Sequence, residues 1–234
     1  MSAAPIALVG SGEYLPVMTE IESALIAGRA PRYVQLATAA APEGEKSLGR
    51  WHQLGKRQAD RLGVEQVVVD VRTRADAENP ALAAAIEGAG LIYLSGGNPD
   101  YLAETLRNTA VWRAIVAAHA VGAAVAGCSA GAMALSDWAP RIRDLNSEHP
   151  TGLGLVSHVR VIPHFDTMPS RIPDVLRNAL LRLPAGTTLL GIDEDTALVG
   201  GPHEWEVKGR QSVWVLGEGT RKEFPAGRTV TTPG

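Results

Sequence analysis

The sequence predicts a three-layer α/β protein, in which helices cover both faces of a mainly parallel sheet and antiparallel strands follow near the C-terminus. Three observations favour this class. Short β-rich runs alternate with longer helical patterns. The early runs are apolar almost throughout, as strands covered on both faces require. In the C-terminal third, closely spaced strands replace the alternation and are typical of hairpins or a meander.

The individual elements follow from these patterns. Four early strands are predicted at Ile6–Val9, Tyr33–Ala37, Val67–Val71 and Leu91–Leu94. Helices are predicted at about 20–27, 47–62, 80–88, 99–108 and 111–121. Farther on, a strand at 159–163 and a helix near 172–183 precede strands at 188–192, 197–199, 203–207 and 212–216. No linker, repeat or low-complexity segment interrupts the chain, so we predict one domain over residues 1–234.

Composition limits the possible functions. The 234 residues are 45% hydrophobic and 20% charged, with a net charge of −3, which is ordinary for one folded domain. Basic residues are scattered and the isoelectric point is near 6.1, so nucleic acid is not an expected partner. There is no targeting pattern and no 18-residue apolar run, so we expect a cytoplasmic protein without membrane contact, as a monomer or homodimer.

The stretch from Ala124 to Leu135 contains the pattern G-x-S-x-G, from Gly127 to Gly131. An apolar strand-like run precedes it and a helical pattern follows it, which is the context of a nucleophile elbow. In such a turn Ser129 would stand above the sheet edge, where the following helix stabilises negative charge. The alternative is that the two glycines only allow a helix to pack closely on a strand.

Three loops follow predicted strands and would lie at the ligand-binding edge of an open α/β sheet. The loop 10–14 has Leu15 where the G-x-G-x-x-G fingerprint needs its third glycine, so nucleotide binding is not expected. The loop 95–98 has paired glycines, and the Gly97 amide could form an oxyanion hole with the amide of Ala130. Its alternative is a plain turn before a helix that begins at Pro99.

The third loop carries His164 at the end of the predicted strand 159–163, and this is the best candidate of six histidines for a general base. A base needs an acid that fixes its tautomer. Three consecutive acids at 193–195 offer candidates, although a solvated turn would have the same sequence. Asp144 is the rival third member.

Five segments together resemble peptidase family S51, which contains dipeptidase E and cyanophycinase. The segments are Gly-Ser-Gly-Glu-Tyr at 10–14, Ser-Gly-Gly-Asn at 95–98, Gly-Cys-Ser-Ala-Gly-Ala at 127–132, Pro-His-Phe at 163–165 and Gly-Ile-Asp-Glu-Asp-Thr-Ala at 191–197. The resemblance implies a fold like that of class I glutamine amidotransferases. It also implies a triad of Ser129, His164 and Glu194, with oxyanion amides from Gly97 and Ala130.

The resemblance further implies a short peptide substrate with an aspartyl residue. An acidic substrate calls for a guanidinium, so we expect Arg171, together with Asn98, to bind the substrate. Cyanophycinases carry several arginines close after their histidine, whereas this chain has only Arg171 within 166–174, which favours the dipeptidase type. No metal or cofactor is expected, because acyl transfer needs none and no metal-ligand motif is present.

Two other hypotheses remain open at this point. The chain could be a binding or regulatory protein that kept the fold and lost turnover. It could also be an amidotransferase-like enzyme that uses Cys128, its single cysteine. The second is disfavoured because Cys128 occupies an x position of the elbow, where its side chain would point away from the site.

Overall fold

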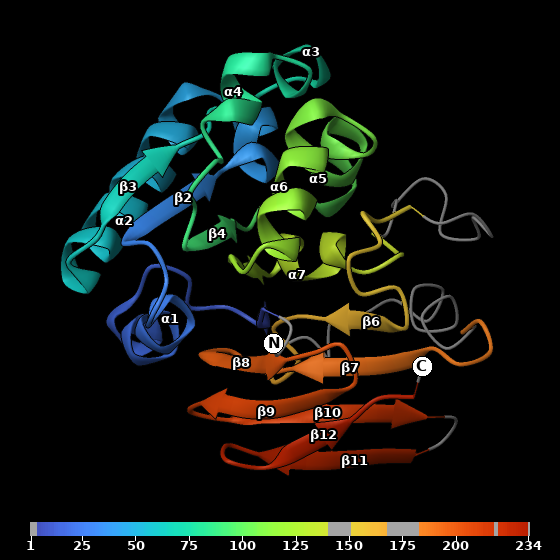
Figure 1. Cartoon of the computed structure of the whole chain (residues 1–234). Helices are drawn as coiled ribbons and strands as arrows, with labels where there is room; N and C mark the ends of the chain where they lie inside the picture. The colour runs from blue at the N-terminus through green and yellow to red at the C-terminus, as the bar shows by residue number, and fades with distance from the viewer. Residues whose placement is uncertain (1–3, 140–150, 168–182, 218–219, 234) are drawn as a thin grey trace.

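The computed structural model describes residues 4–139, 151–167, 183–217 and 220–233, which form two β-sheets with helices packed around the larger one (Figure 1). Within these residues the larger sheet has the strand order β12-β9-β8-β1-β5-β4-β2-β3. Its parallel strands are β1 (Ile6–Val9), β5 (Ala124–Cys128), β4 (Leu91–Leu94), β2 (Arg32–Leu36) and β3 (Glu65–Val68).

Antiparallel strands extend this sheet beyond β1. They are β8 (Thr196–Gly200), β9 (Glu204–Gly209) and β12 (Thr229–Thr231). The second sheet has the order β11-β10-β7-β6, from β6 (Val159–Ile162), β7 (Thr188–Ile192), β10 (Ser212–Gly217) and β11 (Thr220–Pro225). In it β6 and β7 are parallel and the other pairs are antiparallel. The C-terminal strands are therefore divided between two sheets.

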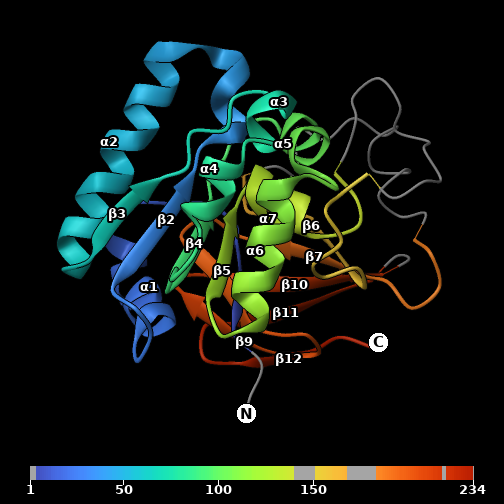
Figure 2. The same cartoon turned by 45° about the horizontal axis from the view of Figure 1, so that its top comes forward.

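Helices cover both faces of the larger sheet (Figure 2). One face packs on α1 (Thr19–Ile26) and α2 (Glu45–Leu62). The other face packs on the second sheet and on α3 (Arg74–Ala77), α4 (Pro80–Ala84), α5 (Pro99–Leu106), α6 (Ala110–Ala120) and α7 (Ala130–Leu135). Two short 3-10 helices, Pro16–Met18 and Thr38–Glu43, follow β1 and β2. The predicted fold class, with its three layers, is confirmed.

Some boundaries differ from the prediction for physical reasons. The strand predicted at Val67–Val71 begins earlier and ends at Val68, because the chain leaves the ladder after Val69 donates to the Gln35 carbonyl. The helix predicted at 80–88 ends at Ala84. The strand β11 was not predicted, because its Thr-Arg-Lys-Glu-Phe-Pro sequence is mostly exposed and lacks an apolar face. The helix predicted near 172–183 lies outside the described residues.

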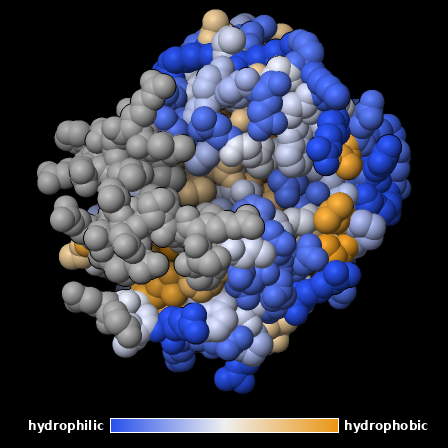
Figure 3. Space-filling model, turned by 180° about the vertical axis from the view of Figure 1, so that it is seen from behind, coloured by the Kyte–Doolittle hydropathy of each residue, from blue (hydrophilic) through white to orange (hydrophobic). Residues whose placement is uncertain are grey.

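The described surface exposes few large apolar side chains. Figure 3 shows a largely hydrophilic face with hydrophobic residues in separate groups. The exposed large apolar side chains of the described residues are Leu15, Val116 and Val121. No helix among the described residues is both long enough and apolar enough to span a bilayer.

The topology brings several strand ends to one edge. Because β1, β5 and β4 are adjacent and parallel, the loops that follow them lie side by side. The strand β8 runs antiparallel to β1, so it begins at the same edge, where the Gly10 amide donates to the Thr196 carbonyl (2.9 Å). In the second sheet, the parallel strands β6 and β7 end together, and the Phe165 amide donates to the Ile192 carbonyl (3.1 Å). This edge carries the candidate residues.

Candidate active site

Ser129 occupies a strained turn between β5 and α7. Its φ of 50° and ψ of −109° are values that a non-glycine residue rarely adopts, and such strain costs roughly 1–3 kcal/mol. The turn is held because the Ser129 amide donates to the Val9 carbonyl of β1 (2.9 Å) and the Ser129 carbonyl accepts from Met133 in α7 (3.1 Å). The serine side chain is partly exposed at the sheet edge.

The two glycines of the elbow are needed for close packing. A Cβ at Gly127 would lie 2.5 Å from the carbonyl carbon of Gly131. A Cβ at Gly131 would lie 2.3 Å from the carbonyl oxygen of Leu94 in β4. The two glycines therefore do allow the helix to pack closely on the strands, as the alternative interpretation proposed. It is compatible with the elbow, because this packing is what fixes Ser129 between strand and helix.

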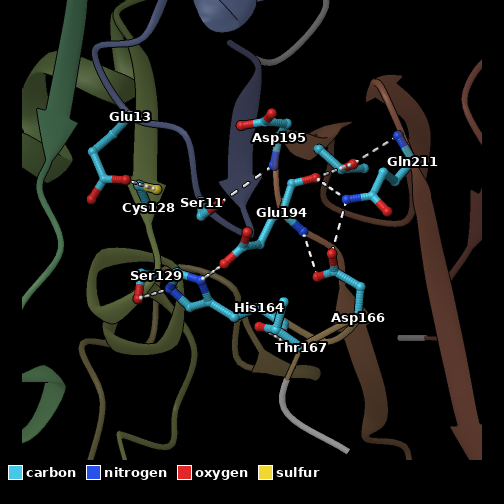
Figure 4. Close-up of polar contacts among 11 residues, drawn as sticks. Ser11, Glu13, Cys128, Ser129, His164, Asp166, Thr167, Glu194, Asp195 and Gln211 are labelled. Atoms are coloured by element: carbon cyan, nitrogen blue, oxygen red, sulfur yellow. Dashed lines mark hydrogen bonds and ion pairs between the residues drawn. The ribbon is translucent and has the colours of Figure 1, made fainter.

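His164 and Glu194 form a hydrogen-bonded chain with Ser129 (Figure 4). His164 Nε2 lies 3.1 Å from Ser129 Oγ, and His164 Nδ1 lies 2.9 Å from Glu194 Oε1. A carboxylate beside Nδ1 favours the tautomer with hydrogen on Nδ1, which leaves Nε2 free to accept from the serine hydroxyl. The arrangement brings together three residues that lie in distant parts of the chain.

Glu194 is the member of the acidic run 193–195 that reaches the imidazole. The Asp193 carboxylate is buried, 5% exposed, and accepts from Trp214 Nε1 (3.0 Å) and from the Ser212 amide (3.2 Å). Burial raises the pKa of Asp193. Asp195 pairs with Arg210 instead (3.2 Å). Asp144, the rival acid, lies outside the described residues.

Asp166 and Gln211 form hydrogen bonds with the backbone of Glu194. The Glu194 amide donates to Asp166 Oδ1 (2.9 Å), and Gln211 Nε2 donates to Asp166 Oδ2 and to the Glu194 carbonyl (both 3.0 Å). Partial burial opposes the charge of Asp166, but these hydrogen bonds outweigh it and keep its pKa below the ordinary value. Sequence analysis did not assign either residue a role. The position of Asp166 beside the predicted base was the only available signal.

The loop 95–98 lies directly beside the elbow. A Cβ at Gly96 would lie 3.6 Å from Ser129 Cβ. Gly97 is exposed, has a φ of 137° and approaches Ala39 so closely that a Cβ would lie 2.4 Å from its carbonyl oxygen. Ala130 is the first residue of α7, so its amide has no acceptor within the helix. Ala130 therefore directly follows Ser129, and Gly97 follows the residue that borders Ser129.

Of the two predicted substrate-binding residues, the structure describes Asn98 but not Arg171. Asn98 is exposed and caps α5, because its Oδ1 accepts from the Tyr101 amide (3.0 Å). Arg171 lies outside the described residues, so its predicted role rests on the sequence.

Cys128 is buried and turned away from this hydrogen-bonded chain. Its thiol donates to Glu13 Oε2 (3.0 Å), apart from the chain through His164 (Figure 4). Burial, and then the negative charge of Glu13, raise the pKa of the thiol well above its usual range. A thiolate, the nucleophilic form, is thus disfavoured. Among the described residues, no group of three or more His, Cys, Asp or Glu side chains is arranged to hold a metal ion.

Comparisons with known proteins show the family of this chain. A family model described as peptidase family S51 matches residues 10–206. The chain belongs to peptidase family S51. This confirms the resemblance found in the sequence.

The S51 chain is similar to proteins of known structure and to curated relatives. It is 43% identical to a peptidase from an acI-B1 Actinobacterium, with 98% of this chain and 97% of that one covered and a TM-score of 0.91. A putative peptidase E protein from Listeria monocytogenes has the same fold, with a TM-score of 0.63, 21% identity and coverage of 89% and 99%. A cyanophycinase of Trichormus variabilis is 29% identical over 81% of this chain, and the match spans 65% of the cyanophycinase.

Proposed function

We propose that this S51 protein is a serine peptidase that hydrolyses short peptides beside aspartyl residues through an acyl-enzyme on Ser129. The observation that carries the proposal is the continuous hydrogen-bonded chain from Glu194 through His164 to Ser129. A nucleophile, a base within hydrogen-bond reach of it and an acid that orients the base are the requirements for nucleophilic acyl transfer.

Acylation begins when Ser129 Oγ attacks the scissile carbonyl carbon. The Oγ proton passes to His164 Nε2, and Glu194 stabilises the resulting imidazolium through Nδ1. The negative charge on the carbonyl oxygen is taken up by the amides of Gly97 and Ala130. When the carbon–nitrogen bond breaks, Nε2 returns the proton to the leaving amine, and the acyl-enzyme remains.

Deacylation repeats these steps with water in place of the serine. His164 accepts a proton from water as the water oxygen attacks the ester carbonyl, and it then returns that proton to Ser129 Oγ. The product is a free carboxylic acid, and the enzyme is regenerated without a cofactor. His164 acts as base and then as acid in each half-reaction.

The aspartyl preference is supported by family membership and by the sequence. A carboxylate side chain on the substrate fits a guanidinium through two parallel hydrogen bonds, and Arg171 is the arginine that the sequence offers close after His164. We assign Arg171 and Asn98 to substrate binding as part of this proposal.

A second candidate is a β-aspartyl peptidase that acts on cyanophycin-like substrates. It is favoured by the 29% identity to the Trichormus cyanophycinase. Against it, the match spans only 65% of that protein, and residues 166–174 hold a single arginine. The aspartyl dipeptidase activity is therefore the primary proposal.

The test combines covalent labelling with hydrolysis. We expect a fluorophosphonate to label the wild-type protein at Ser129, and we expect Ser129→Ala and His164→Ala to abolish both labelling and hydrolysis. Cys128→Ser should retain both. Rates on Asp-Leu, Leu-Leu and β-Asp-Arg then separate the dipeptidase, an unspecific peptidase and the β-aspartyl peptidase. If the wild type shows neither labelling nor hydrolysis across this panel, the chain is a non-catalytic binding protein and the proposal is wrong.

A further inference from the structure

The Glu13 carboxylate lies between the two loops that carry the proposed oxyanion amides. Glu13 belongs to the loop after β1, and its Oε1 accepts from the Gly96 amide (3.2 Å) while its Oε2 accepts from the Cys128 thiol (3.0 Å). A Cβ at Gly96 would lie 2.5 Å from Glu13 Oε1 and 3.6 Å from Ser129 Cβ. Glu13 Oε1 and Ser129 Cβ thus both border the space that a side chain at Gly96 would occupy.

Glu13 has no cationic partner among the described residues. None of the ion pairs that they form includes it. Burial first, and the charge of Glu13 in addition, raise the pKa of its neighbours Cys128, Tyr14 and Glu22. Arg61 donates to the Tyr14 carbonyl (2.7 Å) and does not pair with Glu13. The side chain is only partly buried, and each carboxylate oxygen can accept more than the one bond it has. A ligand cation can therefore reach it.

An uncompensated carboxylate at this position opposes the proposed reaction. The tetrahedral intermediate carries a negative charge on the oxygen beside Gly97, the residue that follows Gly96. Two negative charges that are close together and poorly solvated repel each other, which raises the barrier. A positive charge on the substrate, placed next to Glu13, would remove this penalty.

We propose that Glu13 binds the protonated amino group of the substrate's first residue, so that the peptidase selects free N-termini and cleaves after that residue. The amino nitrogen of an N-terminal residue lies about 2.5 Å from its own carbonyl carbon, because only the Cα separates them. When Ser129 attacks that carbonyl, the ammonium is therefore held beside the elbow. Glu13 contacts the elbow through the Cys128 thiol. This inference rests on the proposed function and adds a determinant of specificity to it.

The test compares a free and a blocked amino group on the same peptide. We measure kcat/KM for Asp-Leu and N-acetyl-Asp-Leu with the wild type, Glu13→Gln and the control Glu20→Gln. Leu-Leu and its acetylated form repeat the comparison without the acidic side chain. Glutamine keeps an acceptor for the Gly96 amide and nearly the same shape. Glu20 is an exposed carboxylate of α1, so its change removes one charge without altering the site.

We expect the wild type to prefer the free amine, and we expect Glu13→Gln to lower kcat/KM for free peptides by about 10- to 100-fold. Acetylated peptides should lose nothing, because the repulsion between Glu13 and the oxyanion disappears with the charge. Glu20→Gln should match the wild type on every peptide. Labelling of Ser129 by a fluorophosphonate verifies that the variant site is intact.

Three results would overturn the inference while the proposed function stands. They are a wild type that cleaves blocked and free peptides equally, a Glu13→Gln variant that loses the same factor on both, and a variant unchanged on both. An equal loss would make Glu13 a positioning residue for the loop at Gly96. If the wild type cleaves no peptide and Ser129 is not labelled, the proposed function fails first and the inference with it.

Discussion

Adding a single methyl group at Gly131 is expected to dislodge the proposed nucleophile. The new Cβ would lie 2.3 Å from the Leu94 carbonyl oxygen, 3.0 Å from its carbonyl carbon and 3.1 Å from its Cβ, and none of these is the flexible end of a side chain. The clash is relieved only if α7 moves away from β4. Overpacking of this kind costs about 1–3 kcal/mol of unfolding free energy. Because Ser129 and Ala130 begin the same helix, a shift on the order of 1 Å should lower kcat/KM about 100-fold.

The matched control is Gly49→Ala. Gly49 is exposed within α2, and a Cβ there would have open space around it. Alanine in a helix interior is favoured over glycine by roughly 0.5–1 kcal/mol, so this variant should be slightly more stable and fully active.

The assay is urea unfolding followed by fluorescence, together with kcat/KM for the best peptide substrate. If Gly131→Ala keeps the wild-type urea midpoint and activity, the close contact with β4 does not hold the elbow and the reasoning is refuted.

Three further predictions concern the acid, its support and a buried carboxyl. Glu194→Gln should lower kcat by as much as about 10⁴-fold, because the amide does not stabilise the productive imidazole tautomer and its charged form, whereas substrate KM should change little. Asp166→Ala should lower kcat about 10-fold through loss of the hydrogen bonds that fix the Glu194 backbone, and an unchanged kcat would show that the support is dispensable. Burial raises the pKa of Glu22 to about 7, so stability should fall by about 3 kcal/mol as pH rises from 4.5 to 7. Urea midpoints across this pH range should show no such fall for Glu22→Gln.

The sign of the Glu22 effect follows from proton uptake. Well below pH 4.5 the carboxyl is protonated in both the folded and the unfolded state, so its contribution is complete. Between the unfolded and the folded pKa, the folded state binds more protons, and stability declines with rising pH. If the wild type and Glu22→Gln have parallel stability profiles, Glu22 does not ionise in this range.

Local patterns were sufficient to predict most of the large sheet and the elbow. The apolar runs of β1, β4 and β5 and the glycines around Ser129 are set by neighbours in the sequence, so they are visible without a structure. The division of the C-terminal strands between two sheets could not be predicted, because it depends on which distant strand each one pairs with. The exposed strand β11 carried no periodic signal at all.

The same distinction applies to the site residues. Residues 193–195 form the turn between β7 and β8, with Asp195 at a φ of 54°, and a run of three acids does not reveal which one meets His164. Asp193 accepts a hydrogen bond from Trp214, and Asp195 forms an ion pair with Arg210. Both partners come from later parts of the chain. The supporting role of Gln211 likewise depends on tertiary contacts and has no counterpart in local sequence.

The two sheets divide the proposed catalytic residues between them. Ser129 follows β5 of the larger sheet, His164 follows β6 of the smaller one, and Glu194 lies in the segment that crosses from β7 to β8. The proposed activity therefore depends on the two sheets keeping their relative position. Any sliding of one against the other would part the imidazole from the hydroxyl while each sheet kept its own ladder of hydrogen bonds. Turnover should accordingly disappear at lower denaturant concentrations than secondary structure does.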